Sequence, residues 1–93
     1  MAFEYDLAPK LRGIIQNLAK RDPKKVLIIN KKIKQIVNSD EFAIEHYKNL
    51  RHDLKGYKRV HIDSHFALTF QYDKEKKFVL FVDFDHHDNI YRK

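Results

Sequence analysis

The sequence predicts an α+β fold, a small two-layer domain in which an N-terminal strand and two amphipathic helices pack on a mainly antiparallel sheet. Apolar residues recur at spacings of three and four through positions 9–37, which is typical of helices with one buried face. After position 56 apolar and polar residues alternate, which is typical of strands. The chain has 93 residues, 43% of them hydrophobic, and we expect residues 1–93 to form one domain.

A short strand and a first helix are predicted at the start of the chain. Aromatic and aliphatic side chains alternate with acidic ones over residues 3–7, as in a strand. Pro9 then suits the first turn of a helix, because the N–H that proline lacks would be unbonded there. We expect this helix over residues 9–21. Its buried face comprises Leu11, Ile14, Ile15 and Leu18.

A second helix is predicted to begin at Asp22 and Pro23, an N-cap residue followed by a proline at the first helical position. The β-branched run that starts at Val26 could also form a strand, but the helical spacing continues to Val37 and favours a helix. The polar residues 40–56 predict no regular element. The buried face of the second helix comprises Val26, Ile29, Ile33, Ile36 and Val37.

Three successive strands are predicted in the second half of the chain. They cover residues 59–62, 66–72 and 78–84. An antiparallel register that places apolar side chains on one face pairs Ile62 with Phe66 and Phe70 with Leu80. In the last strand this apolar face comprises Phe78, Leu80, Val82 and Phe84.

The opposite face of these strands carries side chains that could contact a ligand, because the two predicted helices leave it uncovered. In the expected register, rows of side chains cross all three strands on this face. The two rows are His61, Ala67 and Asp83, and next to it Arg59, Thr69 and Phe81.

Composition limits the classes of partner and of chemistry. Lysine and arginine number 19 against 13 acidic residues, a net charge of +6 that favours an acidic partner such as nucleic acid, an anionic membrane or an acidic protein. Cysteine is absent, which excludes disulfides, thiol catalysis and cysteine-ligated zinc, and favours the cytoplasm. No signal peptide is visible, and no apolar run approaches the ~20 residues of a membrane span.

The six histidines all lie after position 45, and cations and tyrosines accompany them between His46 and His61. Cations that neutralise phosphates and rings that stack on bases suit single-stranded RNA, although a solvated loop beside an edge strand would look the same. The candidate phosphate-binding residues in this stretch are Lys48, Arg51, Lys55 and Arg59.

Histidine is also the side chain best suited to exchange protons near neutral pH. Cleavage of RNA by its own 2′-hydroxyl needs a base for that proton and an acid for the leaving 5′-oxygen, and His61 with His86 or His87 could supply both without a metal or another cofactor. Asp85 to Asp88 could also ligate a metal. Their spacing matches no tight ligand motif, and adjacent histidines on an extended segment point to opposite faces, so we predict no metal site.

Seven cations crowd the junction of the two helices and the second helix itself. We expect them to form the solvated face of an amphipathic helix, with docking to a large RNA such as ribosomal RNA as the alternative. They are Lys20, Arg21, Lys24, Lys25, Lys31, Lys32 and Lys34.

Three segments carry a resemblance to a known family. They are Asn49–Tyr57 (NLRHDLKGY), His61–Phe70 (HIDSHFALTF) and Asp85–Tyr91 (DHHDNIY). In order and spacing, with the helices before them, they resemble the RelE/ParE superfamily of bacterial and archaeal toxins, and within it the YafQ-like mRNA interferases. The resemblance implies a ribosome-dependent endoribonuclease of a type II toxin–antitoxin module, held inactive by a cognate antitoxin.

The resemblance also implies roles for individual residues. His61 matches the acid–base or phosphate-contacting histidine of the family's hairpin, and His86 or His87 matches its C-terminal catalytic histidine. His65, a further candidate catalytic residue, and Phe66, a candidate RNA-binding residue, stand where YafQ-like toxins often have Asp and Trp. Further matches are Tyr91, which could stack on a base, and Lys48, a cation at a position where that branch has histidine.

One departure from the family concerns Ala67, which stands where RelE-type members carry an arginine. Alanine cannot stabilise a phosphate, so this departure favours the histidine-based branch or a weakened activity. Two alternatives therefore stay open. One is a ParE-like toxin that binds a protein target such as DNA gyrase without cleaving RNA. The other is an inactive RNA-binding module of the same fold.

Overall fold

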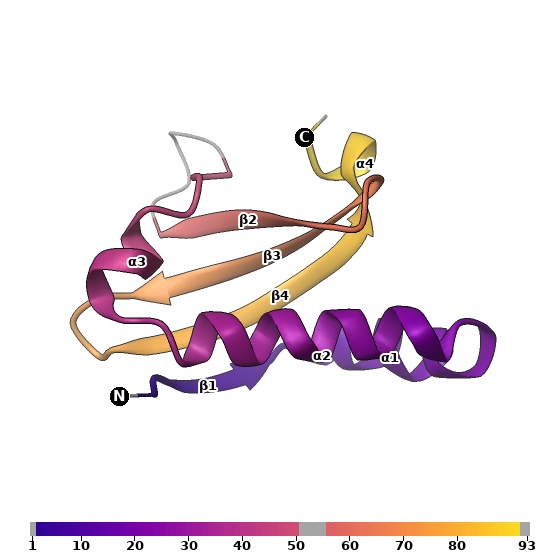
Figure 1. The fold of residues 1–93 in the computed structure, drawn as a ribbon, viewed down its shortest axis with the longest axis horizontal. Coiled ribbons are helices and arrows are strands. Elements are labelled where there is room, and N and C mark those ends of the chain that lie inside the picture. Colours follow the sequence, from indigo (N-terminus) through magenta and orange to yellow (C-terminus); the bar gives the residue numbers. More distant parts are fainter. Residues whose placement is uncertain (1, 51–55, 92–93) are drawn as a thin grey trace.

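The computed structural model describes residues 2–50 and 56–91 of the chain (Figure 1). The elements follow the predicted order, and two short helices join them. The strands are β1 (Glu4–Leu7), β2 (Tyr57–Ile62), β3 (Phe66–Asp73) and β4 (Phe78–His86), and the helices are α1 (Pro9–Arg21), α2 (Pro23–Val37), α3 (Glu41–Glu45) and α4 (His87–Tyr91). No helix among the described residues is both long and apolar enough to cross a membrane.

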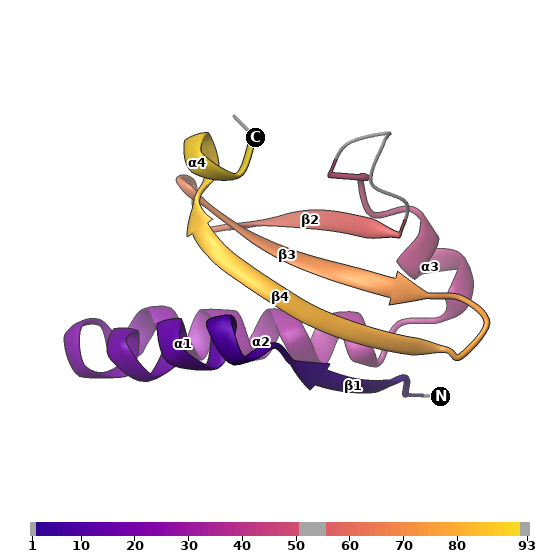
Figure 2. The same cartoon turned by 180° about the vertical axis from the view of Figure 1, so that it is seen from behind.

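The sheet has four strands in the order β1-β4-β3-β2. β1 pairs with β4 in parallel, while β2 with β3 and β3 with β4 are antiparallel. α1 and α2 lie side by side along one face of this sheet, and α4 lies on the other side of it at the C-terminal end of β4 (Figures 1 and 2). The predicted two-layer α+β architecture is confirmed.

The two long helices begin as their sequence predicts. Pro9 occupies the first turn of α1, and Asp22 caps α2 by accepting a hydrogen bond from the backbone N–H of Lys25 at 3.1 Å. The apolar face of α2 enters the core as predicted, except that Val26 is only half-buried. In α1 only Leu11 is fully buried. The core joins these helices to the sheet through Leu11, Ile29, Ile33, Ile36, Leu68, Phe70, Val79 and Phe81.

The register of β3 and β4 differs from the predicted one, and a β-bulge adds to the difference. Ile62 lies opposite Phe66 as expected, but Phe70 lies opposite Phe81 rather than Leu80. The pairing shifts between Thr69 and Phe70, which leaves an extra residue in β4.

The bulge also corrects which residues of β4 enter the core. Val79 and Phe81 are completely buried, whereas Leu80 and Val82, predicted for the core face, are half-buried. Because residues 78–82 are all apolar, their pattern could not distinguish the two faces of the strand.

The polar segment 40–56 contains a helix that its sequence did not predict. Asp40 caps α3 by accepting a hydrogen bond from the N–H of Ala43 at 2.7 Å, and Ile44 is completely buried. Lys58 in β2 then turns its side chain inward, with only 7% of the residue exposed. One capping residue and one buried apolar side chain are enough for this single helical turn. They are too few to produce a periodic pattern in the sequence.

Candidate active site

The four histidines predicted to be catalytic gather at one end of the sheet. His61 ends the exposed face of β2, and His65 lies in the turn to β3. His86 is the last residue of β4 and His87 the first of α4. The backbone N–H of His87 donates a hydrogen bond of 2.8 Å to the carbonyl oxygen of His65, so the main chain ties the hairpin turn to the start of α4.

The four imidazole rings form a row that begins on β2 and ends at the hairpin turn. The ring centroids of His61 and His87 are 6.3 Å apart, those of His87 and His86 5.3 Å, and those of His86 and His65 6.0 Å. The last two pairs are stacked, while His61 and His87 meet edge to face. His61 and His65 are exposed and His86 and His87 half-buried, so solvent reaches the row.

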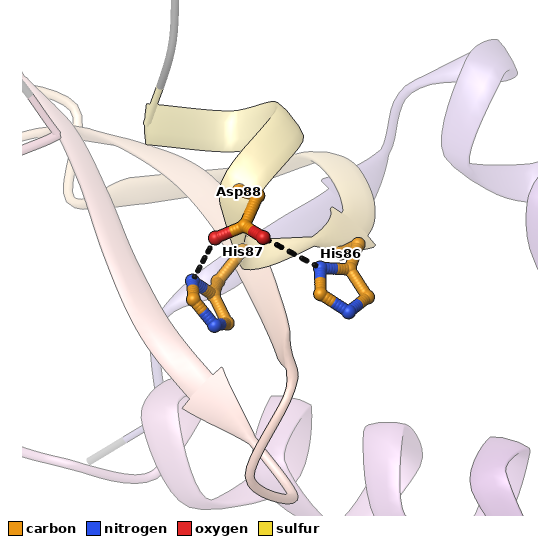
Figure 3. Close-up of side chains that lie close together, drawn as sticks. All are labelled: His86, His87 and Asp88. Carbon is orange, nitrogen blue, oxygen red and sulfur yellow. Dashed lines mark ion pairs between the residues drawn. The ribbon is translucent and has the colours of Figure 1, made fainter.

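His86 and His87 do not point to opposite faces, as an extended segment would require. The backbone changes from strand to helix between them, and their rings stack on the same side. The carboxylate of Asp88 lies between the two rings (Figure 3). Its oxygens are 3.1 Å from Nδ1 of His87 and 3.8 Å from Nδ1 of His86.

The side-chain row across the strands differs from the predicted one. His61 lies opposite Ala67 as expected, but Ala67 lies opposite Asp85, two residues beyond Asp83. One residue of this difference is the offset already present where Phe70 pairs with Phe81, and the bulge adds the second. Asp83 instead accepts a hydrogen bond of 3.1 Å from Nζ of Lys10 in α1, which corrects its predicted place in the row of His61 and Ala67.

This face is also less open than predicted, because α4 contacts β3 and β4 on it. Ala67 is completely buried and Ile90 of α4 nearly so. Phe81, which was expected on this face, lies in the core. An arginine side chain at position 67 would therefore have to displace neighbouring side chains.

Two of the predicted RNA-binding cations, Arg59 in β2 and Lys48 beside it, lie on the side of His61 that leads away from the hairpin. Arg59 precedes His61 by two residues in β2 and therefore lies on the same face of the sheet. Its backbone N–H donates a hydrogen bond of 3.0 Å to the carbonyl oxygen of Lys48. Lys48 is exposed. Arg51, Lys55 and the side chain of Tyr91 lie outside the part of the chain that the structure describes.

Phe66, predicted as an RNA-contacting aromatic, packs into the structure beside the histidines. Its ring stacks with that of Phe84 at 5.1 Å between centroids and meets the edge of His86 at 5.5 Å. Nζ of Lys25, from α2, lies 4.6 Å from its centroid. Lys25 was expected on the solvated face of α2. No local sequence pattern indicates its contact, since the two residues are far apart in the chain.

Lys25 also holds the hairpin turn that carries His65. Its Nζ donates a hydrogen bond of 2.9 Å to Asp63. This bond and the lysine charge, with a further bond from the N–H of Ser64, lower the pKa of the Asp63 carboxyl below its ordinary value. The helical layer thus anchors the turn next to the histidine row. A groove of about 580 Å³ between α1 and β4 ends at Phe66 and Lys25.

Comparison with known proteins identifies the family. The chain is 52% identical over 91 residues to a protein of Methanocaldococcus jannaschii named "Putative toxin RelE4", across 98% of this chain and 93% of that protein. The chain belongs to the RelE family of toxins. This RelE-family chain is also 42% identical over 82 residues to an uncharacterized protein of Methanosarcina mazei, across 88% of the chain and 91% of that protein. No protein-family model and no solved structure matches it.

In this RelE-family toxin, residues from two distant stretches of sequence build one histidine site. The hairpin supplies His61 and His65, and the end of β4 supplies His86 and His87. Ala67 in β3 lies opposite His61 on one side and Asp85 on the other. It is completely buried and carries no charge. The described side chains suited to proton transfer or phosphate contact here include the imidazoles and the cations beside them.

Proposed function

We propose that this toxin is an endoribonuclease that cuts mRNA on the ribosome in the cytoplasm, with His61 and His87 exchanging the protons. The observation that supports this most is the meeting of the two histidines, which are 26 residues apart in sequence and 6.3 Å apart between ring centroids. Imidazoles at this separation leave room for a phosphodiester between them, with each ring in hydrogen-bond reach of one of its oxygens.

The reaction that fits this pair is attack by the 2′-hydroxyl on the neighbouring phosphorus. One imidazole takes the 2′-hydroxyl proton as the O2′–P bond forms, and the other gives a proton to the 5′-oxygen as the P–O5′ bond breaks. The products are a 2′,3′-cyclic phosphate and a 5′-hydroxyl, and the two histidines end with their protons exchanged. The reaction consumes no cofactor.

His87, rather than His86, is the proposed partner of His61, because it is the tail histidine whose ring meets that of His61. His86 instead stacks on His65 and meets the ring of Phe66 edge to face, so we assign it with His65 to contacts that position the RNA. Arg59 and Lys48 continue the surface along β2 and suit the phosphates on one side of the cut. Phe66 is packed against Phe84 and Lys25, so its proposed role is to support His86.

We also propose that a cognate antitoxin controls the protein. Membership of a toxin family supports this partner, and the net charge of +6 favours an acidic protein chain. Contacts with ribosomal RNA would use the exposed cations of α2, among them Lys24 and Lys31.

The test is primer extension on a reporter mRNA in a translating cell-free extract, with and without the purified protein. The wild-type protein should cut at defined codon positions, and only while the message is translated. His61→Ala and His87→Ala should each lower the rate about 10²–10⁴-fold, the usual contribution of a general acid or base. His46→Ala is the matched control, because His46 is the exposed C-cap residue of α3, and α3 lies at the opposite end of the sheet from α4 (Figure 1).

Folding of each variant is checked by circular dichroism. Cleavage by folded His61→Ala and His87→Ala at the wild-type rate would refute the site. If the folded, antitoxin-free wild-type protein cuts nothing, inhibition of DNA supercoiling then distinguishes a gyrase-type target from an inactive module.

A further inference from the structure

The turn from β4 into α4 brings three metal-ligating side chains together. Nδ1 of His87 lies 3.1 Å from one carboxylate oxygen of Asp88, and Nδ1 of His86 lies 3.8 Å from the other. One nitrogen or oxygen atom from each residue lies within 4.8 Å of those of the other two. Their side chains are 44%, 32% and 62% exposed for His86, His87 and Asp88, so an ion could enter from solvent.

These spacings suit a tetrahedral zinc ion. Zinc bonds of about 2.0–2.2 Å to nitrogen and oxygen place neighbouring ligand atoms about 3.3–3.6 Å apart in a tetrahedron. The separations of 3.1 Å for His87 and 3.8 Å for His86 run to different oxygens of the Asp88 carboxylate and fall on either side of that range, so the side chains must rotate to bring one ligand atom of each residue to a common ion. Figure 3 shows the carboxylate of Asp88 already facing both rings.

The kinds of ligand select the kind of metal. Two imidazoles and one carboxylate suit zinc and similar transition metals, whereas magnesium and calcium prefer oxygen ligands throughout. Three protein ligands leave the fourth position to water or to another imidazole. His61 is a neighbour that could provide one, with its ring 6.3 Å from that of His87.

We propose that His86, His87 and Asp88 form a zinc site, and that zinc bound there switches off the toxin. The second statement rests on the proposed function. An imidazole that gives one nitrogen lone pair to zinc keeps its proton on the other nitrogen and can no longer be protonated. His87 could then neither accept nor return a proton during RNA cleavage, and zinc would act as a reversible inhibitor.

Zinc binding is measured first, without any assay of cleavage. Tag-free protein is titrated with ZnCl₂ by calorimetry and by competition with a chromophoric chelator. The wild-type protein should bind one zinc ion per chain. Even residues that only support metal ligands change affinity 10–100-fold, so His87→Ala and Asp88→Asn should each weaken binding at least about tenfold. His46→Ala, which removes a histidine outside the cluster, should bind as the wild type does.

Cobalt(II) provides a second signature of the same site. Bound to the wild-type protein, it should give the visible absorption of a tetrahedral complex, and Asp88→Asn should lose that spectrum while His46→Ala keeps it. Equal zinc binding by the wild type and by the His87→Ala, Asp88→Asn and His46→Ala variants would mean that zinc binds scattered surface histidines. This result would overturn the proposed site. Absence of binding by the wild type would overturn it as well.

Inhibition is measured separately in the translating extract. Zinc should stop cleavage by the wild-type protein at concentrations that fill the site, a chelator should restore it, and Asp88→Asn should need more zinc for the same fractional loss. Zinc binding without any cleavage in metal-free protein would uphold the metal site and refute the nuclease proposal. Cleavage that persists with the site filled would overturn the switch while leaving the nuclease proposal intact.

Discussion

Lys58 illustrates how one residue of a basic stretch can serve the fold rather than the site. It lies two residues before Val60 in β2, on the strand face that packs toward the helices, and only 7% of it is exposed. Its Nζ donates three hydrogen bonds of 3.0–3.1 Å, to the carbonyl oxygens of Glu45 and Tyr47 and to Oδ1 of Asn49. Burial lowers the pKa of this amine, and the charge of Glu45 partly opposes that effect.

Replacing Lys58 should therefore destabilise the protein. Lys58→Met keeps the aliphatic stem but leaves three oxygens without their donor, and we expect a loss of about 1–3 kcal/mol in the free energy of unfolding. Urea unfolding followed by circular dichroism measures it. The control is Lys76→Met at an exposed lysine in the β3–β4 turn. Equal stability of the two variants would contradict the structural role of Lys58.

At the scale of elements, the start of α2 depends on one side chain. Asp22 separates α1 from α2: its N–H donates to the carbonyl of Leu18 at 2.7 Å, and its carboxylate accepts from the N–H of Lys25 at 3.1 Å. The same residue therefore ends one helix and begins the next, which sets the tight turn between them. The first side chain of α2 that is completely buried in the core is Ile29.

Loss of the cap should cost about 1 kcal/mol of stability, since Asp22→Ala removes the side-chain acceptor for a first-turn N–H. Asp22→Asn should restore most of it, because asparagine is an equally good N-cap residue. Urea unfolding of the three proteins side by side tests this. A variant with alanine as stable as the wild type would show that the cap bond contributes nothing.

At the scale of the whole molecule, the ion pair of Lys25 with Asp63 connects the helical layer to the hairpin that carries His65. Asp63 has a backbone φ of 60°, in the left-handed region that aspartate and asparagine tolerate better than most residues. Its pKa is lowered, with the hydrogen bond from Lys25 as the main cause. A carboxyl whose folded-state pKa is lowered stabilises the fold above its ordinary pKa, and this contribution disappears as the pH falls through the folded-state value.

The stability difference between the wild type and Asp63→Asn should consequently depend on pH. Asparagine keeps the backbone conformation but lacks the charge, so we expect the wild type to be the more stable protein at pH 7. The difference should shrink below the ordinary carboxyl pKa of 3.8 and vanish at lower pH. Urea unfolding at several pH values measures it. A difference that stays constant across this range would mean that the charge of Asp63 does not matter.

Local patterns in the sequence were sufficient to predict most of the elements. Helical spacing located α1 and α2, the Asp22–Pro23 pair located the start of α2, and the alternation located β2 to β4, because each signal depends on neighbours a few residues apart. They failed at α3, where one buried isoleucine makes no pattern, and at residues 78–82, where every side chain is apolar.

For the site, the sequence by itself determined which residue types are available: histidines and cations in the second half of a basic chain without cysteine. Only the tertiary structure decided how they meet. The pairing register of β4 and its bulge together placed Asp85 in the row of His61. The turn into α4 placed His86, His87 and Asp88 on one side, and α2 brought Lys25 to the hairpin. These contacts join residues distant in sequence, and such contacts follow from how the layers pack, which no local spacing encodes.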